Sequence, residues 1–158
     1  MLWNVVLAVI IVVALAFACL MLIPAKRKGG ATIEIKASAE QILDILQDAE
    51  NQPTWRKDIR SVEILGDGWT EISNRNVRTR FRWVSVAAQR AELAFESNAG
   101  YSGNWVANLV RTENGTRMEV VGEVTVPNPV SRLITRVFFD PDAFSQSYLD
   151  QLKRKAEQ

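Results

Sequence analysis

Two residue types that often catalyse reactions or bind metals are absent or nearly absent from this chain. The sequence contains no histidine and a single cysteine, Cys19, which lies inside an apolar run. Histidine is the commonest metal ligand and a frequent general base, so serine–histidine and cysteine–histidine catalytic pairs are excluded. A zinc or iron site would have to be built from carboxylates alone, which these ions disfavour. We therefore expect neither a metal nor a cofactor.

Three polar side chains remain as candidates for acid–base or ionic roles: Glu71, Tyr101 and Arg111. Acid–base catalysis requires such a group to be positioned against the reacting atoms, and these three form no recognisable catalytic arrangement. We therefore assign no catalytic residue. Arg111 lies at the end of an apolar strand face, where it could pair with an acidic head group or reach solvent along its aliphatic stem.

That apolar face belongs to a long hairpin expected over residues 100–129. Asn114-Gly115 separates two strand-like runs, and this dipeptide is the strongest short signal for a two-residue hairpin turn. The expected register pairs Glu113 with Thr116, Arg111 with Met118, Leu109 with Val120, Ala107 with Gly122 and Trp105 with Val124. Cross-strand partners point to the same side of a sheet. The apolar face should therefore comprise Trp105, Ala107, Leu109, Met118, Val120, Gly122, Val124 and Val126.

Alternating runs predict the rest of the sheet. In residues 32–37, Ile33 and Ile35 alternate with charged neighbours, as in a half-buried strand. Beyond Trp83 the alternation changes phase, so we expect a bulge there. Further strands are expected over residues 61–65, 69–74, 77–86 and 91–97.

Helix-start signals divide the remainder of the chain. Ser38, with Gln41 three residues later, has the capping-box pattern at the start of an apolar helical stripe. Beyond Pro129 the apolar period becomes helical, and Asp140 followed by Pro141 is typical of a helix N-terminus. These helices should pack on one side of the antiparallel sheet, which defines an α+β fold.

Arginines alternate along the strand expected over residues 77–86, at positions 78, 80 and 82. Such a stripe could bind nucleic acid, or it could be a solvated sheet face paired with carboxylates. The candidate partners are Glu92, Glu96, Glu119 and Glu123. Because the net charge is only +1 and both signs interleave, we favour the solvated face and expect no nucleic-acid partner.

Residues 1–24 are expected to be a transmembrane anchor. Residues 2–23 are apolar apart from Asn4, and about 20 such residues span a bilayer. A cleaved signal peptide is the alternative, although no basic residue precedes the apolar run. The positive-inside rule places Lys26, Arg27 and Lys28, and the domain after them, in the cytoplasm. The basic and glycine-rich residues 25–30 are expected to form a flexible linker to a domain over residues 31–158.

Three local patterns in that domain carry a resemblance to a known family. The first is a strand running into a capped helix, Ile33-Glu34-Ile35-Lys36-Ala37-Ser38-Ala39-Glu40-Gln41-Ile42. The second is Asp48-Ala49-Glu50-Asn51-Gln52-Pro53-Thr54-Trp55-Arg56, and the third is Tyr148-Leu149-Asp150-Gln151-Leu152-Lys153 in the closing helix. With the order of elements, they make the chain resemble the START-like (SRPBCC) superfamily of polyketide cyclase/dehydrase and lipid-transport proteins. The resemblance implies a helix-grip fold, in which a curved antiparallel sheet wraps a long C-terminal helix.

The same resemblance implies a hydrophobic small molecule or lipid in a cavity between sheet and helix. The ligand-binding residues expected on this basis are Phe81, Trp83, Phe95, Trp105, Leu109, Arg111, Met118, Val120, Phe138, Phe144 and Tyr148. Any one of them could instead be an ordinary core residue. The pairing of Ala107 with Gly122 would leave space for a ligand.

We therefore expect a membrane-anchored binding domain rather than an enzyme, since only some relatives of this kind catalyse reactions. One alternative is a protein-interaction domain without a ligand, which would have a solid core and an exposed apolar patch. Another is an enzyme resembling a polyketide cyclase or dehydratase, which would need a buried carboxylate beside the cavity.

Overall fold

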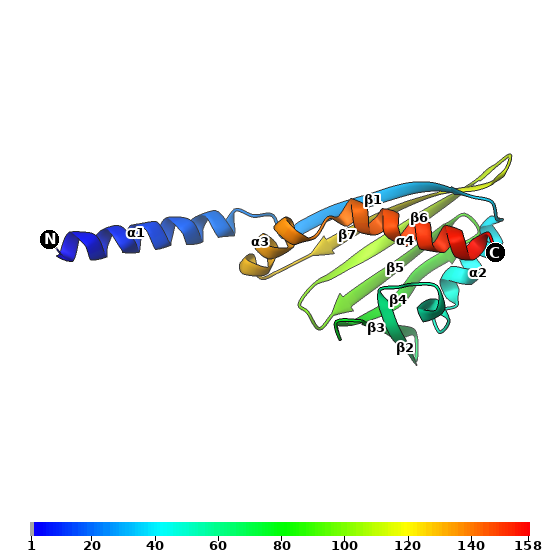
Figure 1. Cartoon of the computed structure of the whole chain (residues 1–158), viewed down its shortest axis with the longest axis horizontal. Helices are drawn as coiled ribbons and strands as arrows, with labels where there is room; N and C mark the ends of the chain where they lie inside the picture. The colour runs from blue at the N-terminus through cyan, green and yellow to red at the C-terminus, as the bar shows by residue number, and fades with distance from the viewer. Residues whose placement is uncertain (1) are drawn as a thin grey trace.

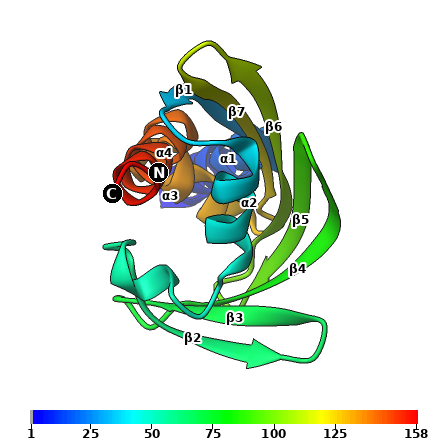
Figure 2. The same cartoon turned by 90° about the vertical axis from the view of Figure 1, so that its right-hand side faces the viewer.

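A computed structural model describes residues 2–158. Its centre is a seven-stranded antiparallel sheet in the order β1-β7-β6-β5-β4-β3-β2, which curves around the C-terminal helix α4 (Figure 1). The N-terminal helix α1 extends away from this domain (Figure 1). Seen from the end of the molecule, α2 and α4 lie on the concave side of the sheet (Figure 2). The expected α+β architecture is confirmed.

The elements follow one another with short connections. The strands are β1 (Lys26–Ile35), β2 (Ile59–Leu65), β3 (Gly68–Ser73), β4 (Arg78–Ala87), β5 (Arg90–Ser97), β6 (Ser102–Thr112) and β7 (Gly115–Thr125). The helices are α1 (Leu2–Met21), α2 (Ala39–Gln47), the 3-10 helix η1 (Gln52–Thr54), α3 (Pro129–Phe138) and α4 (Pro141–Ala156).

Local hydrogen bonds start the helices as the sequence predicts. The Ser38 side chain accepts from the Gln41 N–H while the Gln41 side chain accepts from the Ser38 N–H, so the capping box that begins α2 is confirmed. Asp140 caps α4 with Pro141 at its first turn. Such caps satisfy backbone N–H groups that have no partner within the helix. The bulge in β4 is also confirmed, because its pairing with β5 shifts between Trp83 and Ser85.

The register of the β6–β7 hairpin differs from the expected one by two residues. Thr112 pairs with Gly115, and Leu109 pairs with Met118, so the turn consists of Glu113 and Asn114 and not of Asn114 and Gly115. Gly115 has φ +145° and lies against the Ile35 carbonyl of β1, so the third strand requires glycine at the start of β7. A shift of two residues leaves every side chain on its expected face.

The different register of the β6–β7 hairpin removes a pair of small residues that was predicted to leave space for a ligand inside the domain. Ala107 pairs with Val120 rather than with Gly122, and Gly122 lies opposite Trp105. The small-residue pair expected between β6 and β7 is therefore wrong. Gly122 instead pairs with Gly29 on its other side, which places two glycines on neighbouring strands where α4 begins.

The linker expected over residues 25–30 is also wrong, because β1 starts at Lys26. Gly29 and Gly30 are paired with β7, and Arg27 donates to the Thr135 and Phe139 carbonyls at 2.9 and 3.0 Å. A Cβ atom on Gly29 would lie 2.5 Å from Pro141 Cβ and 2.7 Å from its carbonyl carbon. Glycine at this position therefore lets the first turn of α4 rest directly on the backbone of β1.

The main core lies where α4 and α2 meet the β1–β7–β6 side of the sheet. Leu149 and Leu152 of α4 are fully buried in one cluster with Ile35, Ile42, Leu46, Leu109, Met118 and Val120. On the outer face, Arg78 pairs with Glu63 of β2 and Arg80 with Asp67 of the β2–β3 turn. The solvated arginine stripe is thus present, with different carboxylate partners from those expected.

Most residues of helix α1 whose burial the structure describes are exposed, and Leu20 near its end is half-buried. Its segment Trp3–Met21 is long and apolar enough to cross a membrane, and none of it is buried within the described structure. A signal sequence near an N-terminus would have the same length and composition. Within the part of the chain that the structure describes, α1 contacts the domain mainly at α3.

We predict that Gly29→Ala destabilises the domain while Gly122→Ala, at the paired position, does not. An added methyl group at residue 29 must displace the backbone of Pro141, and such overpacking costs about 1–3 kcal/mol. A Cβ on Gly122 would meet its nearest neighbours at 3.9 Å, which is ordinary contact. Thermal unfolding of the full chain in detergent micelles measures the stability of both variants. Equal melting temperatures for the two variants would contradict this account of the contact between α4 and β1.

Candidate functional site

Ring side chains gather on the concave face of the sheet, on the strands that α4 does not cover. Helix α4 packs mainly against β1, α2 and β7, which leaves the inner faces of β3, β4 and β5 without a helix over them (Figure 2). We call the aromatic side chains on the inner faces of these strands, together with the aromatic side chains that pack against them, the inner aromatic cluster. It comprises Trp69 of β3, Phe81 and Trp83 of β4, Phe95 of β5, Trp105 of β6, Tyr148 of α4, and Trp55, which follows η1.

Pairing of the strands sets the spacing of these rings. Trp69 pairs with Phe81, and Phe81 with Phe95, so the three side chains form a row across three strands. The ring centroids of Trp69 and Phe81 are 5.5 Å apart with a 13° angle between planes, and those of Phe81 and Phe95 are 5.7 Å apart. These separations are those of favourable aromatic pairs.

Tyr148 connects the row to the helical side of the domain. Its ring lies 6.1 Å from that of Trp105 and 5.9 Å from that of Trp55. Within the cluster only Trp69 is fully buried, at 4% exposure; the other rings are half-buried. These half-buried side chains point to the concave side of the sheet and keep part of their surface accessible.

A buried ion pair lies beside the cluster. Arg56 Nη1 donates to Glu71 Oε2 at 2.9 Å and to Gln52 Oε1 at 2.7 Å, while its other nitrogens donate to the Asp58 carboxylate. The second Glu71 oxygen accepts from the Trp69 indole N–H at 3.1 Å. The Arg56 guanidinium also lies 5.2 Å from the Tyr148 ring centroid, within cation–π range. Arg56 thus joins the segment after η1 to β3 and α4.

Burial dominates the ionisation of this group. It raises the pKa of Glu71, and the nearby Arg56 and Trp69 N–H limit that rise. Burial acts to lower the pKa of Arg56, but the charges of Glu71 and Asp58 outweigh it and hold the pKa above its ordinary value. Burial also raises the pKa of Tyr148. With both Glu71 oxygens hydrogen-bonded, the pair is arranged to hold structure together and not to exchange protons freely.

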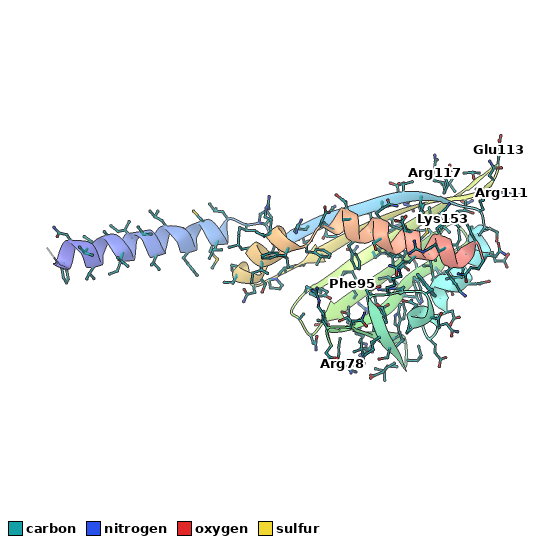
Figure 3. The ribbon with its side chains drawn as sticks, in the orientation of Figure 1. Arg78, Phe95, Arg111, Glu113, Arg117 and Lys153 are labelled. Atoms are coloured by element: carbon teal, nitrogen blue, oxygen red, sulfur yellow. The ribbon has the colours of Figure 1, made fainter. Side chains whose placement is uncertain are left out.

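The structure brings together five of the residues predicted to bind a ligand: Phe81, Trp83, Phe95, Trp105 and Tyr148. Phe95 lies in the middle of the concave region (Figure 3). Three others, Leu109, Met118 and Val120, are fully buried in the main core, where a ligand could not reach them without displacing α4.

The remaining three predicted residues lie away from the cluster. Arg111 is exposed at the tip of the β6–β7 hairpin, close to Glu113 (Figure 3). Phe138 is 83% exposed on α3 and Phe144 is 49% exposed at the start of α4. The α3 stripe that contains Phe138 faces outward, because polar residues of α3 make the contacts with the domain. Phe144 is exposed in the first turn of α4, whereas Leu152 farther along the same helix is buried.

Residues that the sequence analysis did not assign to ligand binding also lie at the candidate site. Trp69 and Glu71 alternate on one strand and so share a face, a signal that the sequence contains. Arg56 gave no such signal, because its burial depends on Glu71, fifteen positions away. Tyr101, considered only as a catalytic candidate, pairs with Thr79 through their hydroxyls at 3.2 Å and lies next to Phe95.

An open depression near the C-terminal end of α4 differs from the aromatic cluster in character. Its volume is about 490 Å³, and it is lined by Glu34, Ile35, Lys36, Thr112, Asn114 and Lys153. Its charged and polar lining would not favour an apolar molecule, so the inner aromatic cluster is the better candidate for a hydrophobic ligand.

Comparison with known proteins identifies both a sequence family and a fold. The model of the family described as "Polyketide cyclase / dehydrase and lipid transport" matches residues 27–157. No curated protein matches the chain in sequence. Because the family match begins at residue 27, it includes the first strand and excludes α1.

Solved structures with the same fold differ widely in sequence. A START superfamily protein from Mycobacterium smegmatis superposes with a TM-score of 0.66 at 17% identity, covering 83% of this chain and 97% of its own. A Thalictrum norcoclaurine synthase mutant with a transition-state analogue gives 0.64 at 14% identity, covering 83% and 94%. The di-domain ARO/CYC protein BexL from the BE-7585A biosynthetic pathway gives 0.65 at 14%, covering 85% and 51%. At these identities the likeness concerns the fold alone.

We predict that Arg56→Met lowers the free energy of unfolding by about 3–5 kcal/mol, because it leaves the Glu71 charge buried without its partner. The loss should shrink as the pH falls. Removing Arg56 raises the pKa of Glu71 further, and a carboxyl whose folded pKa is raised favours folding most when it is protonated. Urea unfolding of both proteins across a pH series measures this difference.

The double variant Arg56→Met/Glu71→Leu is the control. It replaces the ion pair by apolar groups, so it should recover most of the stability and lose the pH dependence. A loss in the single variant that stays constant with pH would contradict the role given to the Glu71 charge.

Proposed function

The chain belongs to the polyketide cyclase/dehydrase and lipid transport family, and from this we propose that it binds a hydrophobic small molecule or lipid on its inner aromatic cluster. The observation that carries the proposal is that Phe81, Trp83, Phe95, Trp105 and Tyr148 face the concave side and remain half-buried. Covering apolar surface stabilises a complex by about 25 cal/mol for each Å² removed from water. Rings of this kind favour a ligand with flat or unsaturated apolar parts.

Polar groups beside the rings would orient such a ligand. The paired hydroxyls of Thr79 and Tyr101 lie next to Phe95 and can accept or donate one further hydrogen bond to a hydroxyl or carbonyl. A few polar groups among apolar walls are typical of small-molecule sites. The ligand class that fits is therefore largely apolar with a single polar end.

We propose further that α1 anchors this domain to a membrane with the domain in the cytoplasm. The apolar length of Trp3–Met21 supports the anchor, and Lys26, Arg27 and Lys28 directly after it support the orientation. An anchor would hold the site near the bilayer, where apolar ligands concentrate, and so raise the effective ligand concentration.

A cyclase- or dehydratase-type reaction is the second candidate. Its support is Glu71, a buried carboxyl with a raised pKa next to the cluster, which is a property of many catalytic acids. Catalysis would require a bound substrate to separate Glu71 from Arg56, because both carboxylate oxygens are hydrogen-bonded. Binding needs no such rearrangement, so we place it first.

The test is solvent extraction of small molecules from the full chain purified into nanodiscs, followed by mass spectrometry. We expect a molecule above the level in empty nanodiscs, reduced about tenfold in Trp83→Ala, since losing one ring contact and its buried area is worth about 1.4 kcal/mol. Val84→Ala is the matched control, because Val84 is the next residue in β4 and is exposed. Equal amounts in the two variants would contradict the site, and no molecule in any sample would contradict ligand binding.

A further inference from the structure

Helix α3 is amphipathic with its apolar side turned away from the domain. Its apolar residues recur at helical spacing and form one stripe, and none of them is buried. The α3 stripe consists of Val130, Leu133, Ile134, Val137 and Phe138. Val137 and Phe138 are 67% and 83% exposed. On a helix that packs against a water-soluble domain, this stripe would face the core.

The polar side of α3 makes the contacts with the domain. Arg132 donates to the carbonyls of Val126, Ile23 and Pro127 at 2.9, 3.1 and 2.7 Å. On the next turn, the Thr135 carbonyl accepts from Arg27 of β1. These bonds fix the rotation of α3 about its own axis. The α3 stripe therefore points outward because the helix is bonded to the domain in this orientation.

The position of α3 indicates what covers the stripe. Ile23, which Arg132 contacts, lies two residues after the end of α1, and α3 is at the end of the domain from which α1 extends (Figure 1). The aromatic residues Phe139 and Phe144 continue the exposed apolar surface, with ring centroids 5.6 Å apart. An apolar medium that encloses α1 would therefore begin beside α3.

Basic side chains border the same place. Arg27, Arg132 and Arg136 lie together where the end of α1, the start of β1 and α3 meet. Among the described residues none of these three is in a salt bridge, although Arg27 and Arg132 donate to backbone carbonyls. Arginine binds phosphate groups with charge-assisted hydrogen bonds, so the positive charge here matches anionic lipid head groups.

We propose that α3 is a second membrane contact, with the α3 stripe in the boundary between lipid head groups and acyl chains and the three arginines on the aqueous, head-group side of the helix. Helices with an apolar face and basic flanks bind bilayers in this way. This proposal rests on the proposed anchoring by α1, because that anchoring places the bilayer at this end of the domain. It adds that the domain lies against the membrane surface through its own helix.

The test measures the depth of nitroxide spin labels in the full chain, reconstituted in vesicles of phosphatidylcholine and phosphatidylglycerol. Single cysteines are introduced in a Cys19→Ser background by Ile134→Cys and Val137→Cys in the α3 stripe, and by Arg136→Cys on the same helix outside it. We expect collisions of the two stripe labels with oxygen to exceed those with a water-soluble nickel chelate. The label at residue 136 should show the reverse preference.

Two further labels separate the outcomes. Asn114→Cys, at the distant hairpin turn, reports a position in water, and Val12→Cys reports whether α1 is in the bilayer. If the stripe labels show the same preference for the nickel chelate as the label at residue 114, the proposal is overturned. A label at residue 12 that still prefers oxygen would then show that the anchor itself stands. Stripe labels shielded from both reagents would also overturn it, because a protein or a second copy would then cover the helix. A label at residue 12 in water would instead count against the anchor.

Discussion

Helix α4 and the short helix α2 are too narrow to cover the whole inner face of a seven-stranded sheet, and the rest of the domain follows from that mismatch. A helix with its side chains is about 10–12 Å wide, whereas seven strands at about 4.8 Å spacing extend across roughly 30 Å. Helix α4 is held close to β1 because Gly29 has no side chain, so its buried leucines serve the β1–β7–β6 side. On the other side, the Arg56–Glu71 ion pair attaches the η1 segment to β3. Between these two attachments the sheet presents rings that neither helix nor loop fully covers.

Local signals in the sequence predicted those parts of the fold that local forces decide. The caps at Ser38 and Asp140 depend on hydrogen bonds within a few residues, and the bulge after Trp83 follows from alternation within one strand. The hairpin register was wrong because a third strand, β1, decides where Gly115 must lie. The linker was wrong for a similar reason: lysine and glycine at residues 26–30 resemble a linker in composition, and only their pairing with β7 makes them a strand.

The site was predicted to the extent that side-chain alternation determines it. Alternation showed which residues of β4, β5 and β6 share a face, and Phe81, Phe95 and Trp105 lie where it placed them. A periodic stripe does not show which medium it faces, so Phe138 of α3 was assigned to an interior that it does not line. Phe144 lies on a helix that is buried at Leu149 and Leu152, but it is exposed in the first turn. Arg56 was missed because a buried charge depends on a distant partner that a local pattern does not contain.

The join between α1 and the domain is itself part of the fold. Only residues 22–25 separate α1 from β1, and two arginines, Arg27 and Arg132, bond the start of β1 and the end of the apolar segment to α3 and its flanks. A flexible linker would let the domain turn freely above a membrane, whereas this join ties the orientation of the sheet to that of the anchor. Under the proposed anchoring, the inner aromatic cluster would keep one fixed orientation toward the bilayer.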